Sequence, residues 1–406
     1  MVGYPPVRYD GLPAQSQHRS PHPRARTRHP QEEAAWGPGH HTVSLEARQS
    51  PVFCVGAGAI GSLIGARLAS AGIPAVLVGR GRHVGAIRRN GVTVDESALG
   101  RGRRVVPVPA YDSLAEALQA EGQPSSVLLT VKAYDAEPAI GEVSALLPAR
   151  TAPHCLLVCL QNGLGVEETA SGRFGLSRVV AGAITLSVER PEPGSLRLLT
   201  DHGGIALSPL APSGGRPRTA LAALAASLSA AGFRVRTYPR FDSVKWSKVI
   251  LNLWANATSA VFDVSPARVV ASPALFAIDW RAFREATNVM RRARIPPVDL
   301  PGYPVRLLVL LASVLPQEAF RRLVGPKVVG GRGGKMPSFW LDLERGRKRS
   351  EVSFLNGAIA SAGDRLGVAT PVNRVLTGAL MDIVSGEVPR GRYIPMRDDP
   401  DRLLAL

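Results

Sequence analysis

Three glycines directly after a short apolar run constrain the fold of this chain more than any other feature of its sequence. They form the pattern G-x-G-x-x-G between a predicted strand, Val52–Val55, and a predicted helix, Ala59–Ala71. Such glycines permit a tight turn, a close approach of the backbone to a pyrophosphate, and close helix–strand packing, while the helix N-terminus faces the negative charge. The turn therefore predicts a dinucleotide site, whose contacts are expected from Gly56, Gly58, Ala59, Ile60 and Gly61.

From Pro51 onward, short apolar runs alternate with stretches of helical periodicity. Because the apolar runs have no polar alternation, they are expected to form a parallel sheet with helices on both faces. A later stretch, Val179–Leu207, predicts antiparallel strands interrupted at Pro191–Gly194. The other predicted elements are strands at Ala75–Val78, Val127–Val131, Leu156–Leu160 and Phe233–Thr237, and helices at Ala136–Leu147 and Thr219–Ala230.

Helical periodicity dominates after Phe241. One apolar run there, Leu307–Leu315, is far shorter than the roughly 20 residues of a membrane span, and it is predicted to be a buried helix. The fold class expected is an α/β Rossmann-type N-terminal domain over residues 51–240 and an all-α C-terminal domain over residues 241–406. Breaks between the later helices are predicted at Pro296-Pro297, Pro301, Gly330–Gly334 and Pro371.

The first 50 residues contain seven of the 34 prolines and five of the eight histidines, with almost no apolar periodicity. Such a segment buries too little apolar surface to offset its ordering entropy. We expect residues 1–50 to be a disordered basic extension. They lack the apolar core of a secretory signal; a transit peptide or a wrongly assigned start codon is an alternative reading.

The formal net charge of +17 raises the question of a nucleic-acid binder. Only six of the 49 basic residues are lysines, and the arginines are scattered among Ala, Gly and Pro without a nucleic-acid-binding motif. The densest stretch, residues 281–349, has 15 basic and five acidic residues. It is either a field that attracts anionic cofactors and substrates or a solvated face. We expect a small-molecule substrate and neither nucleic acid nor membrane as a partner.

The three cysteines cannot form a disulfide framework. Cys54 and Cys159 lie inside apolar runs, and Cys155 begins the second of these runs. No second ligand pair accompanies Cys155 and Cys159, so no metal site is expected. We predict buried thiols in a reducing compartment, and hence a cytoplasmic protein.

The residues after the second predicted strand indicate which dinucleotide binds. A site for NAD usually has Asp or Glu there, on the ribose hydroxyls. This chain has Gly79-Arg80-Gly81-Arg82 instead. A guanidinium can pair bidentately with a 2′-phosphate, which a carboxylate would repel. We therefore predict NADPH, with Arg80 as the first choice and Arg82 as the second; a solvated loop arginine is the alternative.

A lysine and two asparagines are spaced along one predicted helix in a chain that is poor in lysine. Lys248, Asn252 and Asn256 are successive i, i+4 positions, and apolar residues surround them. Reduction of a ketone needs a proton source for the developing alkoxide, and a partly desolvated lysine can supply it. The spacing is equally consistent with a cleft that holds substrate and with a polar stripe facing solvent.

At these residues the sequence resembles the ketopantoate reductase (2-dehydropantoate 2-reductase) family, over Val52 to about Leu380. Several short motifs occur in the order that the family has. Besides the glycine turn and Lys245–Asn256, they are Thr130-Val131-Lys132-Ala133-Tyr134-Asp135, Gln161-Asn162-Gly163-Leu164-Gly165, Pro337-Ser338-Phe339-Trp340-Leu341-Asp342, Ser350-Glu351-Val352, Leu355-Asn356-Gly357 and Thr370-Pro371-Val372-Asn373.

The resemblance implies a role for each matching residue. Lys248 would be the general acid that protonates the carbonyl oxygen, and Glu351 would lie beside it and orient lysine and substrate. Asn252 and Asn256 would bond the polar groups of the substrate, and Ser338 would bond its carboxylate. The remaining two residues would serve the cofactor, with Asn162 beside the nicotinamide and Lys132 flanking the site, although a plain loop lysine is the alternative for the second.

The chain departs from the family pattern at four places. The interval from Asp342 to Glu351 is one residue longer, and Phe339 stands where the family often has methionine. The segment 295–334 is longer and richer in arginine, and a family asparagine beyond Asn256 falls near Ser265-Pro266. All four departures are expected to affect substrate recognition more than hydride transfer.

Together these features predict NADPH-dependent reduction of a small 2-oxo acid, with 2-dehydropantoate to (R)-pantoate, a step of pantothenate biosynthesis, as the leading reaction. A paralogous reductase of a bulkier 2-oxo acid is the alternative, and a catalytically inactive NADP(H) sensor is a third possibility. A homodimer is possible.

Overall fold

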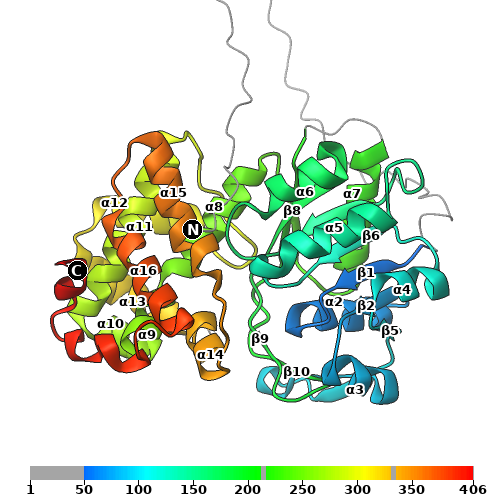
Figure 1. The fold of residues 1–406 in the computed structure, drawn as a ribbon, viewed down its shortest axis with the longest axis horizontal. Coiled ribbons are helices and arrows are strands. Elements are labelled where there is room, and N and C mark those ends of the chain that lie inside the picture. The colour runs from blue at the N-terminus through cyan, green and yellow to red at the C-terminus, as the bar shows by residue number, and fades with distance from the viewer. Residues whose placement is uncertain (1–49, 212–215, 331–334, 406) are drawn as a thin grey trace, which may run out of the picture.

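The computed structural model describes residues 50–211, 216–330 and 335–405, and the expected extension over residues 1–50 falls almost wholly outside them. Two bodies stand side by side in Figure 1, an α/β sheet with its helices and an assembly of helices. This confirms the predicted fold class of a Rossmann-type α/β region followed by an all-helical one.

The described part of the first body is built on an eight-stranded sheet in the order β12-β11-β8-β7-β6-β1-β2-β5. All neighbouring strands are parallel except β8 and β11, which are antiparallel. The strands are β1 (Val52–Val55), β2 (Ala75–Val78), β5 (Ala110–Tyr111), β6 (Ser126–Leu129), β7 (Leu156–Cys159), β8 (Val179–Ile184), β11 (Ile205–Pro209) and β12 (Val235–Thr237).

Alternating side chains of the central strand explain why both faces of this sheet are covered. Val52 and Cys54 of β1 belong to one buried apolar cluster, and Phe53 and Val55 belong to another. Helices α2 (Ala59–Ser70), α3 (Arg82–Asn90) and α7 (Arg216–Ala230) pack in the first cluster. The second cluster contains α4 (Leu114–Glu121), α5 (Ala136–Leu146) and α6 (Val166–Phe174).

All three cysteines are free and buried, as predicted. Burial raises the pKa of the Cys54 and Cys155 thiols to about 12, so neither carries appreciable thiolate near neutral pH.

A smaller four-stranded sheet, which the sequence pattern did not predict as a separate unit, lies below the main sheet in Figure 1. Its order is β4-β3-β10-β9, with β4 (Arg103–Val106), β3 (Val92–Asp95), β10 (Ser195–Leu198) and β9 (Val188–Glu189). The buried ring of His83 joins it to the main body: Nδ1 accepts a hydrogen bond from Gly194 N at 2.8 Å, and Nε2 lies 3.1 Å from Ser62 Oγ of α2.

We predict that His83 makes folding stability fall with acid. Burial, and then the charge of Arg190, lower its pKa to about 4 from the ordinary 6.5. Since the unfolded chain binds the proton first, His83 contributes stability fully above pH 6.5 and progressively less as the pH falls toward 4. After allowance for solvent screening, the loss is on the order of 2 kcal/mol. Urea unfolding at several pH values should show this slope in the wild type and a shallower one in His83→Gln.

The second body is helical throughout its described part and packs on the sheet through α8. In its largest core cluster, the Trp254 ring stacks on the rings of Phe276 and Phe320, with centroids 5.4 Å apart in both pairs. Its helices are α8 (Phe241–Leu253), α9 (Ala257–Phe262), α10 (Pro266–Ala271), α11 (Pro273–Arg292), α12 (Val305–Val314), α13 (Gln317–Gly330), α14 (Ser338–Glu344), α15 (Asn356–Leu366) and α16 (Pro371–Ser385).

The prediction of a buried helix at Leu307–Leu315 is wrong. Helix α12 buries Val305 and Ala312, but Leu307, Leu310 and Val314 are 50%, 55% and 64% exposed. The run is apolar on every side of the helix, whereas only one side of α12 contacts the core. None of the described helices combines the length and the hydropathy that a membrane span requires.

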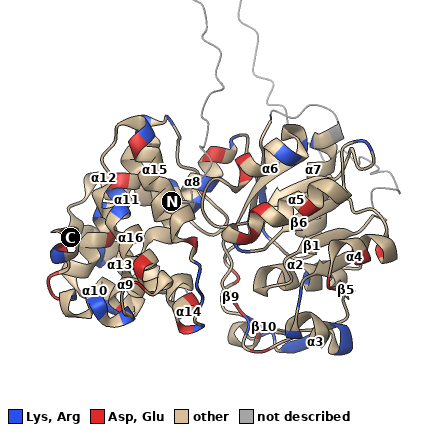
Figure 2. Cartoon of the chain, in the orientation of Figure 1, with Lys and Arg blue, Asp and Glu red and all other residues tan. Residues whose placement is uncertain are grey.

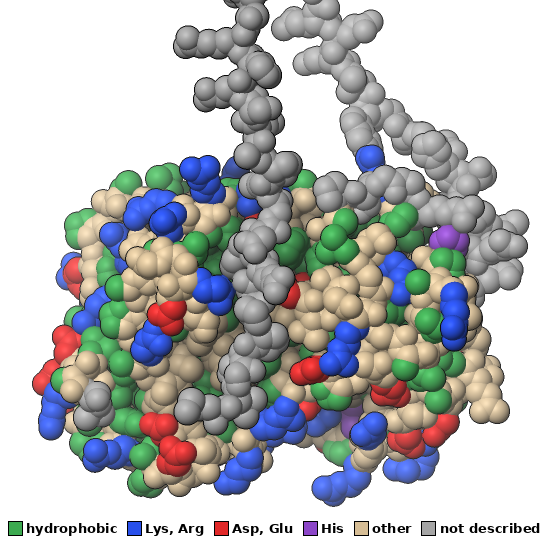
Figure 3. Space-filling view, turned by 45° about the horizontal axis from the view of Figure 1, so that its top comes forward, with side chains coloured by type: hydrophobic (Ala, Val, Ile, Leu, Met, Phe, Trp, Pro, Cys, Tyr) green, Lys and Arg blue, Asp and Glu red, His purple; other side chains and the backbone are tan. Residues whose placement is uncertain are grey.

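Charged residues occur in the elements of both bodies (Figure 2). On the face drawn in Figure 3, lysine and arginine side chains are spread among hydrophobic and acidic ones and do not form one continuous stripe. This distribution differs from the clustered basic surface that is typical of nucleic-acid-binding domains.

Candidate active site

A cavity of about 720 Å³ lies between the two bodies, at the carboxyl ends of β1, β6 and β7. Open α/β sheets usually bind ligands at this edge. From the α/β body, its wall includes Gly56, Gly58 and Asn162, which lie in turns after strands. From the helical body, it includes Ser338 and Glu351. The cavity therefore collects most of the residues that were predicted separately from the sequence.

The glycine turn has the geometry that its pattern predicts. Gly56 has φ +105°, and a side chain there would place Cβ 2.7 Å from the carbonyl carbon of Thr130. A Cβ at Gly61 would lie 2.6 Å from Thr130 Oγ1, whereas one at Gly58 would meet no atom nearer than Gly56 O at 3.9 Å. Two of the glycines thus permit close packing, and Gly58 keeps its side open toward the cavity that it lines, together with Ala59 and Ile60.

The two arginines after β2 are placed differently. Arg80 is exposed and lines the cavity. Arg82 begins α3 and does not contribute to the described cavity wall. Of the two arginines predicted to contact a 2′-phosphate, Arg80, the first choice, lies on the described cavity wall, and Arg82, the second choice, does not.

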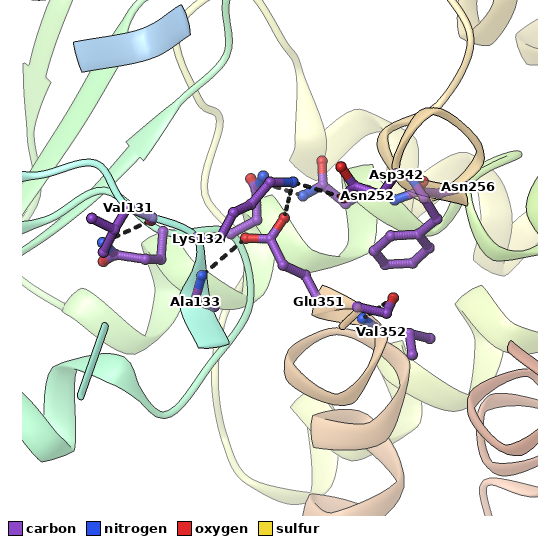
Figure 4. Close-up of polar contacts among 12 residues, drawn as sticks. Val131, Lys132, Ala133, Asn252, Asn256, Asp342, Glu351 and Val352 are labelled. Carbon is purple, nitrogen blue, oxygen red and sulfur yellow. Dashed lines mark hydrogen bonds and ion pairs between the residues drawn. The ribbon is translucent and has the colours of Figure 1, made fainter. Parts of the chain in front are cut away.

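Lys132 joins the two bodies over the cavity, as Figure 4 shows. Its Nζ donates to Glu351 Oε2 at 2.8 Å and to Asp342 Oδ2 at 3.0 Å. The other oxygen of Glu351 accepts from Ala133 N at 3.2 Å. Burial acts to lower the pKa of Lys132, but the charges of Glu351 and Asp342 outweigh it and raise that pKa. Lys132 therefore holds its proton firmly, and it orients the carboxylate of Glu351 at the cavity wall.

The extra residue between Asp342 and Glu351 does not displace either carboxylate. Both are buried and both contact Lys132. The intervening residues 345–349 form an exposed loop in which Gly346 has φ +63°. The loop absorbs the longer interval, and Glu351 keeps its place on the cavity wall.

The expected continuous helix through Lys248, Asn252 and Asn256 is wrong, because α8 ends at Leu253 and α9 begins at Ala257. Ala255 has φ +49°, and its amide donates to the buried carboxylate of Asp279 at 2.6 Å. Asp279 also accepts from Thr258 Oγ1. A carboxylate from α11 therefore stabilises the break. The sequence around residue 255 contains no proline or glycine that would predict the end of a helix.

The break gives the two asparagines different partners. Asn252 Nδ2 donates to Asn162 Oδ1 at 3.1 Å, which ties α8 to the cavity wall. Asn256 is buried, and its Oδ1 accepts from Phe339 N at 3.4 Å, near the start of α14. Asn252 thus lies beside the cavity (Figure 4), whereas Asn256 positions the helix that carries Ser338.

Two lysines of α8 lie in different surroundings. Lys245 is buried, with Nζ 2.8 Å from Glu167 Oε1 and donating to Gln161 O at 2.6 Å. Since Gln161 precedes Asn162, this lysine fixes the turn after β7. Lys248 is half-buried, one helical turn before Asn252, and is not among the described residues of the cavity wall.

The other departures from the family pattern lie away from the cavity. The Phe339 ring is fully buried in the helical core, and Trp340 Nε1 donates to Asp263 Oδ1 at 2.7 Å. None of the described residues of the segment 295–334 lines the cavity. The expectation that these departures affect substrate recognition is therefore not supported by their positions.

Several wall residues were not among the predicted site residues. Asp342 and Tyr134 were part of quoted motifs, so the motifs themselves could have pointed to them. The wall arginines Arg190, Arg345 and Arg347 have no neighbouring sequence motif that distinguishes them from arginines on the surface. The additional charged or polar wall residues are Asp112, Ser113, Thr130, Tyr134, Asp135, Glu142, Gln161, Glu189, Arg190, Lys335, Asp342, Arg345 and Arg347.

Comparisons with known proteins agree with this arrangement. The ketopantoate reductase PanE/ApbA family model matches residues 52–212, and the model of its C-terminal region matches residues 240–384. The 2-dehydropantoate 2-reductase of Aquifex aeolicus (strain VF5) is 27% identical over 325 residues, which cover 80% of this chain and 93% of that protein.

Solved structures cover the same region. A PanE/ApbA family ketopantoate reductase from Ralstonia eutropha JMP134 is 29% identical, with a TM-score of 0.66, over 83% of this chain and 99% of its own. D-mandelate dehydrogenase, in a ternary structure with NADH and anilino(oxo)acetate, has the same TM-score and coverage at 22% identity, a likeness of fold. The chain belongs to the ketopantoate reductase family of oxidoreductases.

Proposed function

We propose that this protein reduces a small 2-oxo acid with NADPH, and that 2-dehydropantoate to (R)-pantoate is its leading reaction. The observation that carries the proposal is the cavity of about 720 Å³ between the two bodies. The glycine turn and Arg80 line one part of it, and Ser338 and the Lys132–Glu351 pair line another. A dinucleotide and a small carboxylic acid therefore have adjoining places in one space.

The residues of the glycine turn are suited to hold the cofactor. Gly58 is open toward the cavity, and the N-terminus of α2 follows it, where backbone amides and the helix dipole favour a pyrophosphate. Arg80 on the same wall supplies a guanidinium for a 2′-phosphate. Asn162, held by Asn252, lies at the end of β7 and would position the nicotinamide.

Arg80→Ala is expected to raise the Kd for NADPH roughly ten-fold and to leave the Kd for NADH nearly unchanged, because a charge-assisted pair with the 2′-phosphate is lost. Nicotinamide fluorescence titrations measure both constants. Arg82→Ala is the matched control, since Arg82 is two residues away and off the described cavity wall. An unchanged NADPH-to-NADH ratio in Arg80→Ala would remove Arg80 from cofactor selection.

The reduction needs a proton donor as well as a hydride. The bound reduced nicotinamide supplies the hydride. We assign the proton to Lys248, because Lys132 is held protonated by two carboxylates and is a poor acid. Lys132 and Glu351 instead form a fixed charged wall beside the carbonyl, and Ser338 is available to bond the carboxylate of the substrate.

A reductase of a bulkier 2-oxo acid is the second candidate. The bulky residues Phe339 and Trp340 and the long segment 295–334 would favour it, but none of their described residues lines the cavity. Rates of NADPH oxidation on a panel of 2-oxo acids separate the two candidates. We expect the highest kcat/KM for 2-dehydropantoate; a larger 2-oxo acid with a higher value would replace it.

We also infer that the domain boundary falls near residue 240 and that the enzyme works in the cytoplasm. The exposed leucines of α12 offer a surface for a homodimer. An NADP(H) sensor without turnover is less well supported, because a sensor needs the glycine turn but not Lys248 and Glu351.

A further inference from the structure

Three arginines from the two bodies meet at the wall of the active-site cavity. Arg190 directly follows β9, and Arg345 and Arg347 lie in the loop that follows α14. In Figure 2 the segment leaving α14 is largely blue and faces β9. Lys335, just before α14, donates to Val188 O of β9 at 2.6 Å and so holds the two segments near each other.

The three guanidinium groups differ from the arginines around them. Arg349 of the same loop pairs with Asp135 at 2.7 Å, whereas within the described residues no ion pair or side-chain hydrogen bond is formed by Arg190, Arg345 or Arg347. Burial, and then the charges of Arg345 and Arg347, lower the pKa of Arg190. Like charges this close repel one another, and an anion between them reverses that balance.

Four of the six acidic residues of the described cavity wall are paired with other cations, and no described ion pair joins the remaining two, Glu142 and Glu189, to the three arginines. Lys132 engages Asp342 and Glu351, and Arg349 engages Asp135. Asp112 pairs with Arg88 at 2.8 Å. Most of the negative charge on the wall is therefore neutralised locally.

The neighbours of the arginines place them at the dinucleotide half of the cavity. The charge of Arg190 acts on His83, whose ring contacts Ser62 in the first turns of α2, the helix that follows the glycine turn. The charge of Arg347 acts on Tyr134, which follows β6 on the cavity wall. Arg190 thus lies near the helix that follows the glycine turn, and Arg347 lies near the Lys132–Glu351 pair, where the two parts of the cavity meet.

We propose that Arg190, Arg345 and Arg347 form a clamp for the phosphate groups of the dinucleotide, contributed from both sides of the cleft. This inference rests on the proposed function. Guanidinium groups pair bidentately with phosphate oxygens. Because the helical body contributes two of the three groups, binding of the phosphates also draws the two bodies together over the substrate.

Equilibrium titrations with NADPH and NADH, followed by nicotinamide fluorescence, test the clamp without relying on turnover. The double variant Arg345→Ala/Arg347→Ala is expected to raise the Kd by roughly ten-fold or more, and Arg190→Ala by roughly ten-fold. Lys348→Ala is the matched control, because it removes one positive charge from the same loop but lies off the described cavity wall. Its Kd should stay within about two-fold of the wild type.

The pattern of losses identifies the phosphate. Equal losses for both cofactors assign the clamp to the pyrophosphate, and a loss for NADPH alone assigns it to the 2′-phosphate; either supports the proposal. Unchanged constants for both cofactors overturn it, including the case in which only the KM of the 2-oxo acid rises. If the double variant does not fold, Arg347→Lys, which keeps the charge but loses the bidentate geometry, decides by the same criterion. A wild type that binds neither cofactor would instead refute the proposed function.

Discussion

Lys248→Ala is expected to lower the turnover number by at least about 10²-fold, with the Kd for NADPH unchanged. General acid catalysis by a positioned side chain contributes about this factor, which corresponds to about 2.7 kcal/mol of transition-state stabilisation. Lys248 is half-buried on α8, one turn before Asn252, whose side chain bonds the cavity-wall residue Asn162. Steady-state kinetics and a fluorescence titration measure the two quantities.

Lys132 supplies the comparison for that experiment. Its ammonium is fixed by Glu351 and Asp342, so it is expected to position groups at the cavity wall without transferring a proton. Lys132→Gln should therefore raise KM as well as lower kcat, whereas Lys248→Ala should act on kcat. Normal turnover in Lys248→Ala would remove Lys248 from the mechanism and leave the source of the proton open.

Lys245→Met is expected to lower the free energy of unfolding by about 3–5 kcal/mol, the cost of leaving one partner of a buried ion pair uncompensated. Lys245 and Glu167 are both nearly inaccessible, and their charged atoms are 2.8 Å apart. Burial, and then the charge of Glu167, already raise the pKa of the neighbouring Glu168 to about 7 against the opposing charges of Lys245 and Arg365, so loss of the ammonium removes one of the two cations that act on this carboxyl group. Urea denaturation measures the change.

A double-mutant cycle separates the ion pair from simple loss of packing. Lys245→Met/Glu167→Leu should recover much of the lost stability, because no buried charge is then left unpaired. If the double variant were as unstable as the sum of the two single variants, the ion pair would not be the source of the effect.

The features that the sequence predicted well depend on neighbours close in the chain. The turn from Gly56 to Gly61 needs only the strand before it and the helix after it, and the structure forms both. The alternation of apolar runs with helices was likewise sufficient for the parallel sheet. The resemblance to a family predicted Glu351 and Ser338 as site residues, although both are distant in sequence from the glycine turn, and the structure places both on the same cavity wall.

The features that were missed depend on distant partners. The break between α8 and α9 needs Asp279, which binds the amide of Ala255 from α11. Helix α12 is apolar apart from Arg306 and Ser313, and its leucines and valines are spread over several sides, so the pattern does not reveal which of them stay exposed. Arg190 and Arg347 look like any other arginines of a chain with 49 basic residues, and only their placement at one cavity distinguishes them.

In the proposed function, the two bodies enclose one site in which hydride would pass from NADPH to the carbonyl carbon of a 2-oxo acid. A direct test incubates the enzyme with 2-dehydropantoate and NADPH in which deuterium replaces both hydrogens at C4 of the nicotinamide, and analyses the product by mass spectrometry. We predict a 2-hydroxy acid with one deuterium at C2, formed at the rate at which NADPH is consumed. Tight NADPH binding without any deuterated product, from 2-dehydropantoate or from other 2-oxo acids, would show that the protein is not a 2-oxo acid reductase.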